Sequence, residues 1–573
     1  MKLTRILSTL AVAALATLSS TSTAAPGDLD LTFGGTGKVI TDIGSTADRA
    51  YGVALQADGK IVVAGARGFG IAVVRYKTDG TLDTSFNGTG KVITSVGSEA
   101  VARSVVVQAD QKIVVAGYSV VSGNNWDFAV IRYNTDGSLD TSFNGTGIVT
   151  ANFGGKDVGQ SVALQSDQKI VVAGWTLSNA VGLLPVVIRY NTDGSLDASF
   201  NGSGTITEFA IYQGQGYDVA VQTDQKIVVT GYSVNNGINA DEFAVWRFNV
   251  NGTPDNSFNG TGKVTKSFGS GSVASDSRPY SVALQSDSKI VVAGFVRDGT
   301  THNFALMRFN ANGTLDSDFN GIGRVVTHFS DSSDFANGVA IQSDGKIVAA
   351  GFSGASGSSD FALVRYDANG YLDTSFNGDG KLTTDFGGRG DTGQCVAIQG
   401  DGRIVVGGYS SNGVNDDFAL ARYESDIDTD TDGIPDRFET GTGTYVSPED
   451  TGTSPTNPDS DGDGLTDGQE VYTHHSNPNI KDTDADGFDD GFEVSTGFSP
   501  TSAASTPDAL SSIRTAAEYR FNAANGISYR IEASTDLANW TTIETNIVGS
   551  GGVITRFYSI EGQPKRYFRS RRN

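Results

Sequence analysis

Three stretches towards the end of the chain place carboxylates at the same positions of a twelve-residue window. They are DTDTDGIPDRFE (428–439), DSDGDGLTDGQE (459–470) and DTDADGFDDGFE (482–493), with acids at positions 1, 3, 5, 9 and 12 and glycine at position 6. Calcium takes six to eight oxygen ligands, and this spacing is typical of a loop around one ion. The predicted calcium ligands, with position 7 offering its backbone carbonyl, are Asp428, Asp430, Asp432, Ile434, Asp436, Glu439, Asp459, Asp461, Asp463, Leu465, Asp467, Glu470, Asp482, Asp484, Asp486, Phe488, Asp490 and Glu493.

The region that contains these loops is strongly acidic. Residues 426–500 hold 19 acidic and two basic side chains, a net charge of −17. A solvated acidic tail is the alternative for such a composition, but three complete matches to one spacing favour cation binding. Without a cation, we expect the loops to repel themselves open. The segment SPTNP before the second loop disfavours the entering helix of an EF-hand.

Seven copies of one unit precede this region. The phrase SDQKIVVAG (166–174) recurs with small changes at steps of 52 to 63 residues. Each unit contains four short runs rich in Val and Ile, several of them separated by Asp-Gly or Asn-Gly dipeptides that favour tight turns. The aspartates of the phrase are Asp58, Asp110, Asp167, Asp224, Asp287, Asp344 and Asp401.

Four antiparallel strands in each of seven units predict an all-β fold, a seven-bladed β-propeller. A linear solenoid is the alternative, but solenoid units are usually shorter. In each unit but the last, an arginine precedes the aspartate of an LDxSF-like motif by eight residues, and Arg422 has no such copy after it. An unpartnered LDLTF motif containing Asp30 stands near the N-terminus. We therefore expect residues 29–43 to complete the seventh blade beside residues 418–423, with Asp30 near Arg422.

Two families resemble these regions. Through LDxSFxGxG, QxDGKIVVAG and FAxxRY, the seven units resemble the bacterial delta-60 repeat, a family of predicted β-propellers that implies no common chemistry. The acidic loops, with SPTNPDSDGDG between them, resemble thrombospondin type 3 repeats of the bacterial kind, which implies calcium binding. After residue 505, five alternating segments predict a small β module, and its STDLANW and terminal arginines resemble a C-terminal module of secreted bacterial proteins.

The N-terminus and the composition bear on location and partners. The start, MKLTRILSTLAVAALATLSSTSTAA, has the early cations, apolar run and small residues of a secretory signal peptide cut after Ala25. The net charge of −24 argues against nucleic acid and against an anionic membrane surface as partners. No later segment is apolar enough for membrane insertion. We expect a secreted or cell-surface monomer with an extracellular glycan or protein ligand.

The sequence offers no recognised catalytic constellation. The four histidines (His302, His328, His474 and His475) do not recur, and none lies in a nucleophile or zinc spacing. Cys395 takes a place filled by glycine or serine in other units, so we expect a buried small residue there. The recurring Arg and Asp series predicts structural pairs within blades. No catalytic residue and no cofactor other than Ca²⁺ is predicted.

One rim of the propeller is the expected binding face. The residue after the KIVVAG phrase is aromatic in six units, and packing between blades explains it better than sugar stacking. The segments that follow differ most between units, which is where a propeller would carry specificity. These aromatic residues are Tyr118, Trp175, Tyr232, Phe295, Phe352 and Tyr409.

The sequence therefore predicts four regions: a signal peptide (1–25), the propeller (26–424), an irregular calcium-binding repeat stalk (425–505), and a C-terminal β module (506–573). We expect an exported, non-enzymatic binding or adhesion protein. One alternative is a propeller enzyme acting on polysaccharide, a lyase or hydrolase, and another is a purely structural surface component. Fold alone does not separate them.

Overall fold

The computed structural model describes residues 25–44, 46–122, 125–178, 182–207, 213–235, 240–268, 276–330, 332–355, 357–426, 428–505, 516–559 and 566–573. The predicted signal peptide falls outside these residues except for Ala25. The chain divides into two compact units, Met1–Ile427 and Asp428–Asn573, which are described separately. Within the described residues, no helix is long and apolar enough to cross a membrane.

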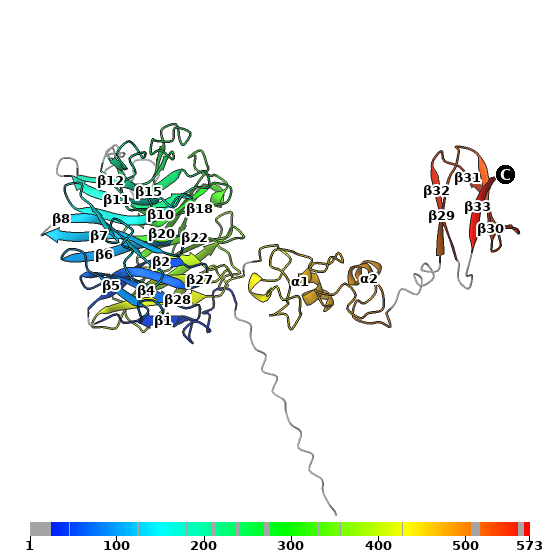
Figure 1. Cartoon of the computed structure of the whole chain (residues 1–573), viewed down its shortest axis with the longest axis horizontal. Coiled ribbons are helices and arrows are strands. Elements are labelled where there is room, and N and C mark those ends of the chain that lie inside the picture. Colours follow the sequence, from blue (N-terminus) through cyan, green and yellow to red (C-terminus); the bar gives the residue numbers. More distant parts are fainter. Residues whose placement is uncertain are drawn as a thin grey trace, which may run out of the picture. The chain divides into compact units, whose positions relative to one another are not determined.

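The first unit contains seven antiparallel sheets of four strands each (Figure 1). Blade 1 consists of β2 (Asp48–Leu55), β3 (Ile61–Arg67), β4 (Gly70–Tyr76) and β5 (Lys91–Thr94). Blade 2 consists of β6 (Glu99–Val107), β7 (Ile113–Ser122), β8 (Asn125–Tyr133) and β9 (Ile148–Ala151). Blade 3 consists of β10 (Asp157–Leu164), β11 (Ile170–Ser178), β12 (Gly182–Tyr190) and β13 (Thr205–Thr207).

The remaining blades repeat this order. Blade 4 consists of β14 (Gly214–Val221), β15 (Ile227–Asn235), β16 (Ala240–Phe248) and β17 (Lys263–Lys266). Blade 5 consists of β18 (Ser277–Leu284), β19 (Ile290–Asp298), β20 (Thr301–Phe309) and β21 (Arg324–Thr327), with the short 3-10 helix η1 (Phe319–Gly321) before β21. Blade 6 consists of β22 (Asp334–Ile341), β23 (Ile347–Ser353), β24 (Asp360–Tyr366) and β25 (Lys381–Thr384).

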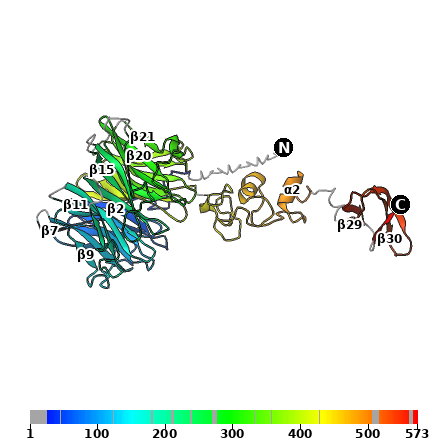
Figure 2. The same cartoon turned by 90° about the horizontal axis from the view of Figure 1, so that it is seen from above.

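Blade 7 joins the two ends of the ring. It consists of β26 (Asp391–Ile398), β27 (Ile404–Ser411), β28 (Asp416–Tyr423) and, as its outer strand, the N-terminal β1 (Lys38–Thr41). Lys38 to Thr41 pair with Ala421 to Phe418 in antiparallel register, and β1 lies beside β28 in Figure 1. Figure 2 shows the blades of the propeller from above. The predicted closure is confirmed, and the linear solenoid is excluded because the first and last units are paired.

The middle two strands of each blade form the core. Every residue of β4 is buried, as are the first five residues of β3. Strands that are buried on both faces have continuous apolar sequences. This explains why apolar and polar residues do not alternate in KIVVAG and FAVIRY. Separate clusters of buried residues lie between neighbouring blades, and Phe33 and Tyr76 help to pack blade 7 against blade 1.

The recurring arginines and aspartates form buried ion pairs. The Arg Nε or Nη atom lies 2.6–2.8 Å from the Asp Oδ2 atom in all seven pairs. The guanidinium also reaches the next blade, as where Arg75 donates to the carbonyl of Thr135 at 2.7 Å. The predicted pairing is confirmed, including Asp30 with Arg422. The pairs are Arg75–Asp83, Arg132–Asp140, Arg189–Asp197, Arg247–Asp255, Arg308–Asp316, Arg365–Asp373 and Arg422–Asp30.

The second unit contains the acidic repeats and a small β module. The repeats have little regular structure: η2 (Asp436–Phe438), α1 (Asp467–Gln469), the π-type turn η3 (Glu470–His474) and α2 (Asp490–Thr496). In the β module, β29 (Ala516–Asn522) pairs with β32 (Val553–Ser559), and β30 (Ser528–Ser534) lies between β31 (Thr541–Val548) and β33 (Tyr567–Arg572). Ile531 is fully buried at the centre of this module.

Candidate metal centres and a ligand-binding mouth

Each acidic loop is a tight turn held by its own carboxylates. Glycine at position 6 adopts a positive φ of about +100° in all three loops, which other residues rarely tolerate. In the first loop, Asp428 at position 1 accepts the backbone N–H of Gly433 at 2.9 Å, and Asp432 at position 5 accepts that of Ile434 at 2.6 Å. The third loop repeats both contacts. One oxygen each from Asp428, Asp430 and Asp432 lies within 4.8 Å of the others, so the loop gathers its carboxylates in one place.

Position 9 has a bracing role that the spacing did not suggest. Asp436 accepts the backbone N–H of Thr429 with one oxygen at 2.7 Å and its hydroxyl with the other at 2.6 Å. Asp467 and Asp490 make the same two contacts with Ser460 and Thr483. The position 9 carboxylate therefore closes its own loop through position 2. The signal was present in the sequence as a hydroxyl residue at position 2 of every loop.

Several carboxylate oxygens that face into the loops are buried, and no described residue hydrogen-bonds to them. In the first loop these are Asp430 Oδ2, Asp432 Oδ2 and Glu439 Oε2. The second and third loops add Asp461 Oδ2, Glu470 Oε2, Asp484 Oδ2, Asp486 Oδ2 and both Glu493 oxygens. A buried carboxylate without a partner is costly, and here several of them point at one space.

The electrostatics agree with the geometry. Burial, together with the neighbouring Asp461 and Asp463, raises the pKa of Glu470 to about 9. Burial and nearby aspartates also raise the pKa of Glu439 to about 8 and that of Asp432 to about 7. In the third loop the pKa of Glu493 rises to about 7 for the same reasons. Groups of this kind need either protons or a cation at neutral pH.

Neighbouring loops interlock. One oxygen each from Asp432, Glu439 and Asp467 lies within 4.8 Å of the others, although Asp467 belongs to the second loop. Between the second and third loops, the backbone N–H of Gly491 donates to Asp463 Oδ2 at 2.6 Å. The three sites are therefore coupled by direct contacts.

This donor set fits Ca²⁺. All candidate side-chain donors are oxygens, and hard cations such as Ca²⁺ and Mg²⁺ prefer oxygen ligands. Positions 1, 3, 5 and 12 would hold the ion. Ile434 and Leu465 at position 7 are buried, and Phe488 is partly buried. Bound calcium would supply the positive charge that the loops lack.

In the propeller, a β-bulge places one residue of each innermost strand at the axis. The pairing of β2 with β3 skips Tyr51, and the other six blades skip the equivalent residue. Bulges re-aim side chains in this way. All seven residues line an axial cavity of about 470 Å³, and they are Tyr51, Arg103, Gln160, Tyr217, Tyr280, Asn337 and Gln394.

The axial cavity shares two of its lining residues, Phe335 and Phe352, with a groove of about 860 Å³ on the rim. Arg389, His302 and Tyr409 also line the groove, and its walls come from the loops that vary between units. We call the axial cavity and this groove together the mouth. The sequence predicted one rim as the binding face but did not reveal the seven bulge residues, because these residues share a position in the repeat and differ in residue type.

The six aromatic residues after KIVVAG differ in exposure. Trp175 is partly exposed and packs against the cluster that contains Tyr118 and Val158, outside the mouth. Tyr118, Tyr232 and Phe295 are 5–6% exposed and pack between blades as expected. Phe352 and Tyr409 are partly exposed and line the mouth. Arginines lie over several of these rings: Arg49 over Tyr409 at 5.1 Å and Arg103 over Tyr118 at 5.8 Å.

Cys395 differs from expectation in its exposure. It is partly exposed at the wall of the axial cavity, because its repeat position faces the axis in every blade. Burial of the sulfur raises the pKa of the thiol to about 12, although the thiol bonds to the carbonyl of Gly407. A thiol with such a pKa is a poor nucleophile.

One carboxylate, Asp218, stands among the described residues of the axial cavity, and no histidine does. It accepts the hydroxyls of Ser161 and Ser281 and the backbone N–H groups of Val219 and Val282. Burial raises its pKa. With four donors from three blades, Asp218 ties the inner strands together.

Comparison with known proteins identifies both kinds of repeat. The family model for a β-propeller domain of unknown function, DUF5122, matches residues 56–86, 108–143, 165–200, 222–258, 285–319, 342–376 and 399–431. The bacterial TSP3 repeat model matches residues 459–479. No curated protein sequence matches the chain.

The chain is also similar, at low sequence identity, to several solved structures. A protein of unknown function from Dyadobacter fermentans is 11% identical, with a TM-score of 0.38, covering 68% of this chain and 98% of its own. Virginiamycin B lyase from Staphylococcus aureus is 8% identical, with a TM-score of 0.39, covering 67% and 98%. The polysaccharide lyase Uly1 is 11% identical, with a TM-score of 0.40, covering 68% and 92%. On the family matches and its seven closed blades, the chain is a DUF5122 β-propeller protein with a bacterial TSP3 repeat.

Proposed function

We propose that the protein is an extracellular binding module in which the propeller mouth takes a glycan and the stalk is loaded with calcium. The observation that carries the calcium part is the set of buried, unpartnered carboxylate oxygens in three successive loops. Bacterial TSP3 repeats are of a calcium-binding type. Calcium is abundant outside cells, where weak calcium sites are filled. The predicted signal peptide supports the same location.

The mouth supports a neutral, hydroxyl-rich ligand. Three tyrosines, two glutamines, an asparagine and an arginine converge on the axis, a mixture that offers both donors and acceptors. Tyr409 and Phe352 add aromatic faces on the rim.

The mouth is also the part of the propeller that is free to vary. The recurring ion pairs and apolar strands are the same in every blade, whereas the bulge residues differ from blade to blade. A structural requirement would favour one residue type at all seven positions. Different side chains converging on one cavity indicate selection for an asymmetric ligand.

A glycan array probed with the full chain tests this proposal. We expect binding to a restricted set of glycans, with affinity falling at least tenfold in Gln160→Ala, Gln394→Ala and Tyr409→Ala. Gln111→Ala is the matched control, because Gln111 lies on the turn between β6 and β7 and outside the mouth. Equal binding by the mouth variants and the wild type would exclude the mouth as the site.

The enzyme alternative makes a different prediction. A lyase or hydrolase needs an acid and a base near the substrate. In the mouth, Asp218 is held by four hydrogen bonds, Asp416 is paired with Arg49, and His302 Nδ1 is bonded to the Ser333 hydroxyl. We therefore expect no turnover on panels of polysaccharide, peptide and ester substrates. A reproducible activity abolished by Tyr217→Phe or Tyr280→Phe would establish the enzyme instead.

A further inference from the structure

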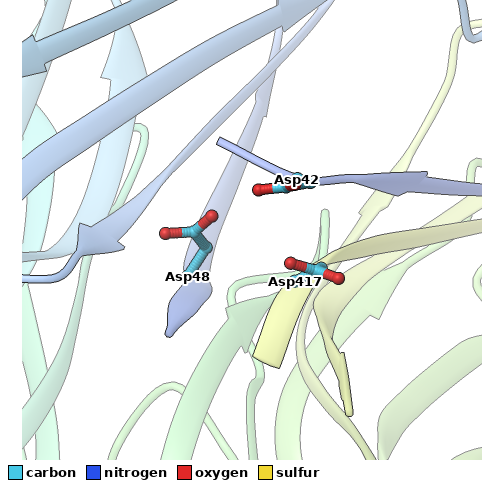
Figure 3. Close-up of side chains that lie close together, drawn as sticks. All are labelled: Asp42, Asp48 and Asp417. Carbon is cyan, nitrogen blue, oxygen red and sulfur yellow. The ribbon is translucent and has the colours of Figure 1, made fainter. Parts of the chain in front are cut away.

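Three repeat positions meet where the chain crosses from blade 7 to blade 1, and the equivalent residues Asp360, Asp385 and Asp391 form the same kind of cluster between blades 6 and 7. The three positions are the residue after the outer strand, the residue facing it on the third strand, and the first residue of the next innermost strand. Between blades 7 and 1 they are Asp42, Asp417 and Asp48. Figure 3 shows these three carboxylates turned toward one another, and we call them the crossing triad.

The crossing triad is compact and mostly buried. One oxygen from each carboxylate lies within 4.8 Å of the other two. Asp48 is 0% exposed and Asp417 is 5% exposed, while Asp42 reaches solvent. Solvent access on one side and burial on the other would allow an ion to enter and be held.

Part of each carboxylate is already engaged. Asp48 Oδ2 accepts the backbone N–H of Ile43 at 2.8 Å, and Asp417 Oδ2 accepts the Asn412 side-chain amide at 2.9 Å. The Oδ1 atoms of Asp48 and Asp417 are buried, and no described residue hydrogen-bonds to either. Two buried oxygens of this cluster therefore have unused acceptor capacity.

No basic side chain neutralises the crossing triad among the described residues. The Lys91 ammonium donates to the backbone carbonyl of Asp42 at 2.7 Å and not to a carboxylate of the crossing triad. Arg49 is paired with the neighbouring Asp416 at 2.6 Å. Arg67 faces Asp48 across β2 and β3, but among the described residues no ion pair joins a basic side chain to any of the three carboxylates.

Another crossing in the same ring shows how a donor set balances this position. Between blades 2 and 3 the equivalent residues are Asp127, Asn152 and Asp157. There the Asn152 amide donates to Asp127 Oδ1 at 2.7 Å, and the Thr176 hydroxyl donates to Asp157 Oδ1 at 2.5 Å. The crossing between blades 7 and 1 has a carboxylate where that crossing has an amide donor. At the crossing between blades 7 and 1 no described donor reaches Asp48 Oδ1 or Asp417 Oδ1.

We propose that the crossing triad binds a divalent cation, Ca²⁺, at the seam where the ring closes. The donors are all oxygens, two of them buried and otherwise unpartnered, and water would complete the coordination. A set without nitrogen or sulfur donors does not favour zinc. Because β1 precedes Asp42 and β28 carries Asp417, the ion would join both ends of the propeller to blade 1.

Calcium stoichiometry of the full chain, measured by native mass spectrometry, tests this site. We expect Asp48→Asn and Asp417→Asn each to bind one calcium fewer than the wild type. Asp157→Asn is the matched control, because it makes the same change at a crossing that already has amide and hydroxyl donors, and its stoichiometry should not change. Wild-type stoichiometry in both crossing-triad variants would overturn the proposal, as would the loss of one ion in Asp157→Asn.

A second measurement needs no variant. In the wild type, saturating calcium should slow hydrogen exchange of the backbone amides from Ile43 to Asp48, by roughly 100-fold at a calcium concentration 100 times the Kd. The same amides in Asp48→Asn should exchange equally with and without calcium. Unchanged exchange in the wild type would refute the site even if the variants fail to fold. Calcium in the stalk adds the same number of ions to the wild type and to each variant, so the loss of one ion reports on the crossing triad alone, and this proposal and the proposed function fail independently.

Discussion

The propeller and the stalk use the same residue type in opposite ways. In the propeller, each recurring aspartate lies within 2.8 Å of an arginine. Burial would raise the pKa of Asp140, but bonds from Ser142 and Lys112 and the charge of Arg132 hold it well below its usual range. In the stalk the pKa of Glu470 is raised to about 9. The propeller carries its countercharges in its own sequence, and the stalk depends on the solution for them.

This difference shows that the two regions are stabilised by different kinds of countercharge. A pair formed within the chain is present whenever the chain folds. A carboxylate cluster that needs a cation folds only when the cation is present, because binding free energy becomes folding free energy. The crossing triad would be a third case: a carboxylate cluster that depends on a cation, as in the stalk, but located in the propeller.

The largest expected effect separates the two regions by chelation. Adding EDTA to the full chain at pH 9, where most of the stalk's carboxyls have lost their protons, should unfold the stalk and leave the propeller intact, since the propeller's recurring aspartates keep their arginine partners. Hydrogen exchange should approach unprotected rates across residues 428–505. Amides of β7 and β8 serve as the internal control and should stay slow. A stalk that remains protected in EDTA would contradict the comparison.

Calcium binding itself should fail when position 12 is removed. In Glu439→Ala/Glu470→Ala/Glu493→Ala, we expect the roughly three calcium ions of the stalk to be lost, because position 12 is the bidentate ligand. Calorimetric titration of the full chain measures the stoichiometry. The matched control is Glu449→Ala, an acid in the same region outside the three loops. Unchanged stoichiometry in the triple variant would refute the site assignments.

Opening the ring should cost the propeller more than losing everything after it. Deleting residues 28–43 removes β1 and leaves Arg422 buried without Asp30. Breaking such a pair costs about 3–5 kcal/mol, so we expect a melting temperature lower by roughly 10 °C or more. Truncation after residue 425 should change the propeller's melting temperature less. The opposite order would show that closure contributes little.

The pH dependence of calcium binding follows from the raised pKa values. A carboxyl with a folded pKa near 8 or 9 keeps its proton at pH 7 when no cation is bound. Calcium should therefore displace roughly two to three protons per chain at pH 7. The stability of the calcium-free stalk should fall as pH rises from about 4.5 to 9, because the folded form then loses its protons. Calorimetry in buffers of different ionisation enthalpy measures the release, and a release of no protons would contradict the raised pKa values.

The smallest effects belong to exposed pairs in the propeller. Asp58 lies 2.5 Å from Lys60 but its side chain is 53% exposed, so Asp58→Ala should cost under about 1 kcal/mol. Asp83→Ala removes the partner of the buried Arg75 and should cost about 3–5 kcal/mol. Shifts in the denaturation midpoint compare the two. Equal shifts would show that burial does not determine how strongly an ion pair stabilises this propeller.

Much of this fold could be predicted because repetition exposes it. Seven copies of KIVVAG fix the number of blades, and the unmatched Arg422 and Asp30 predict the closure. The loops were equally visible, since carboxylate spacing is local in the sequence. The mouth could not be predicted, because Tyr51 and Gln160 occupy equivalent bulge positions but have different side chains. The crossing triad was hidden for another reason: it joins Asp42 and Asp48 to Asp417, and only the closed ring brings them together.

The strand that closes the ring has a consequence for folding kinetics. Asp30 and Arg422 are 392 residues apart, and contacts of such long sequence separation form slowly. During synthesis β1 is made first, yet its partner β28 is among the last parts of the propeller to be made. Until then blade 7 has an open edge, and each incomplete chain is exposed to proteases and to pairing with other chains. Only a chain that has been synthesised through β28 can pair β1 with its partner strand and close the ring. Incomplete chains therefore stay open and differ from the finished propeller in their exposed strand edges.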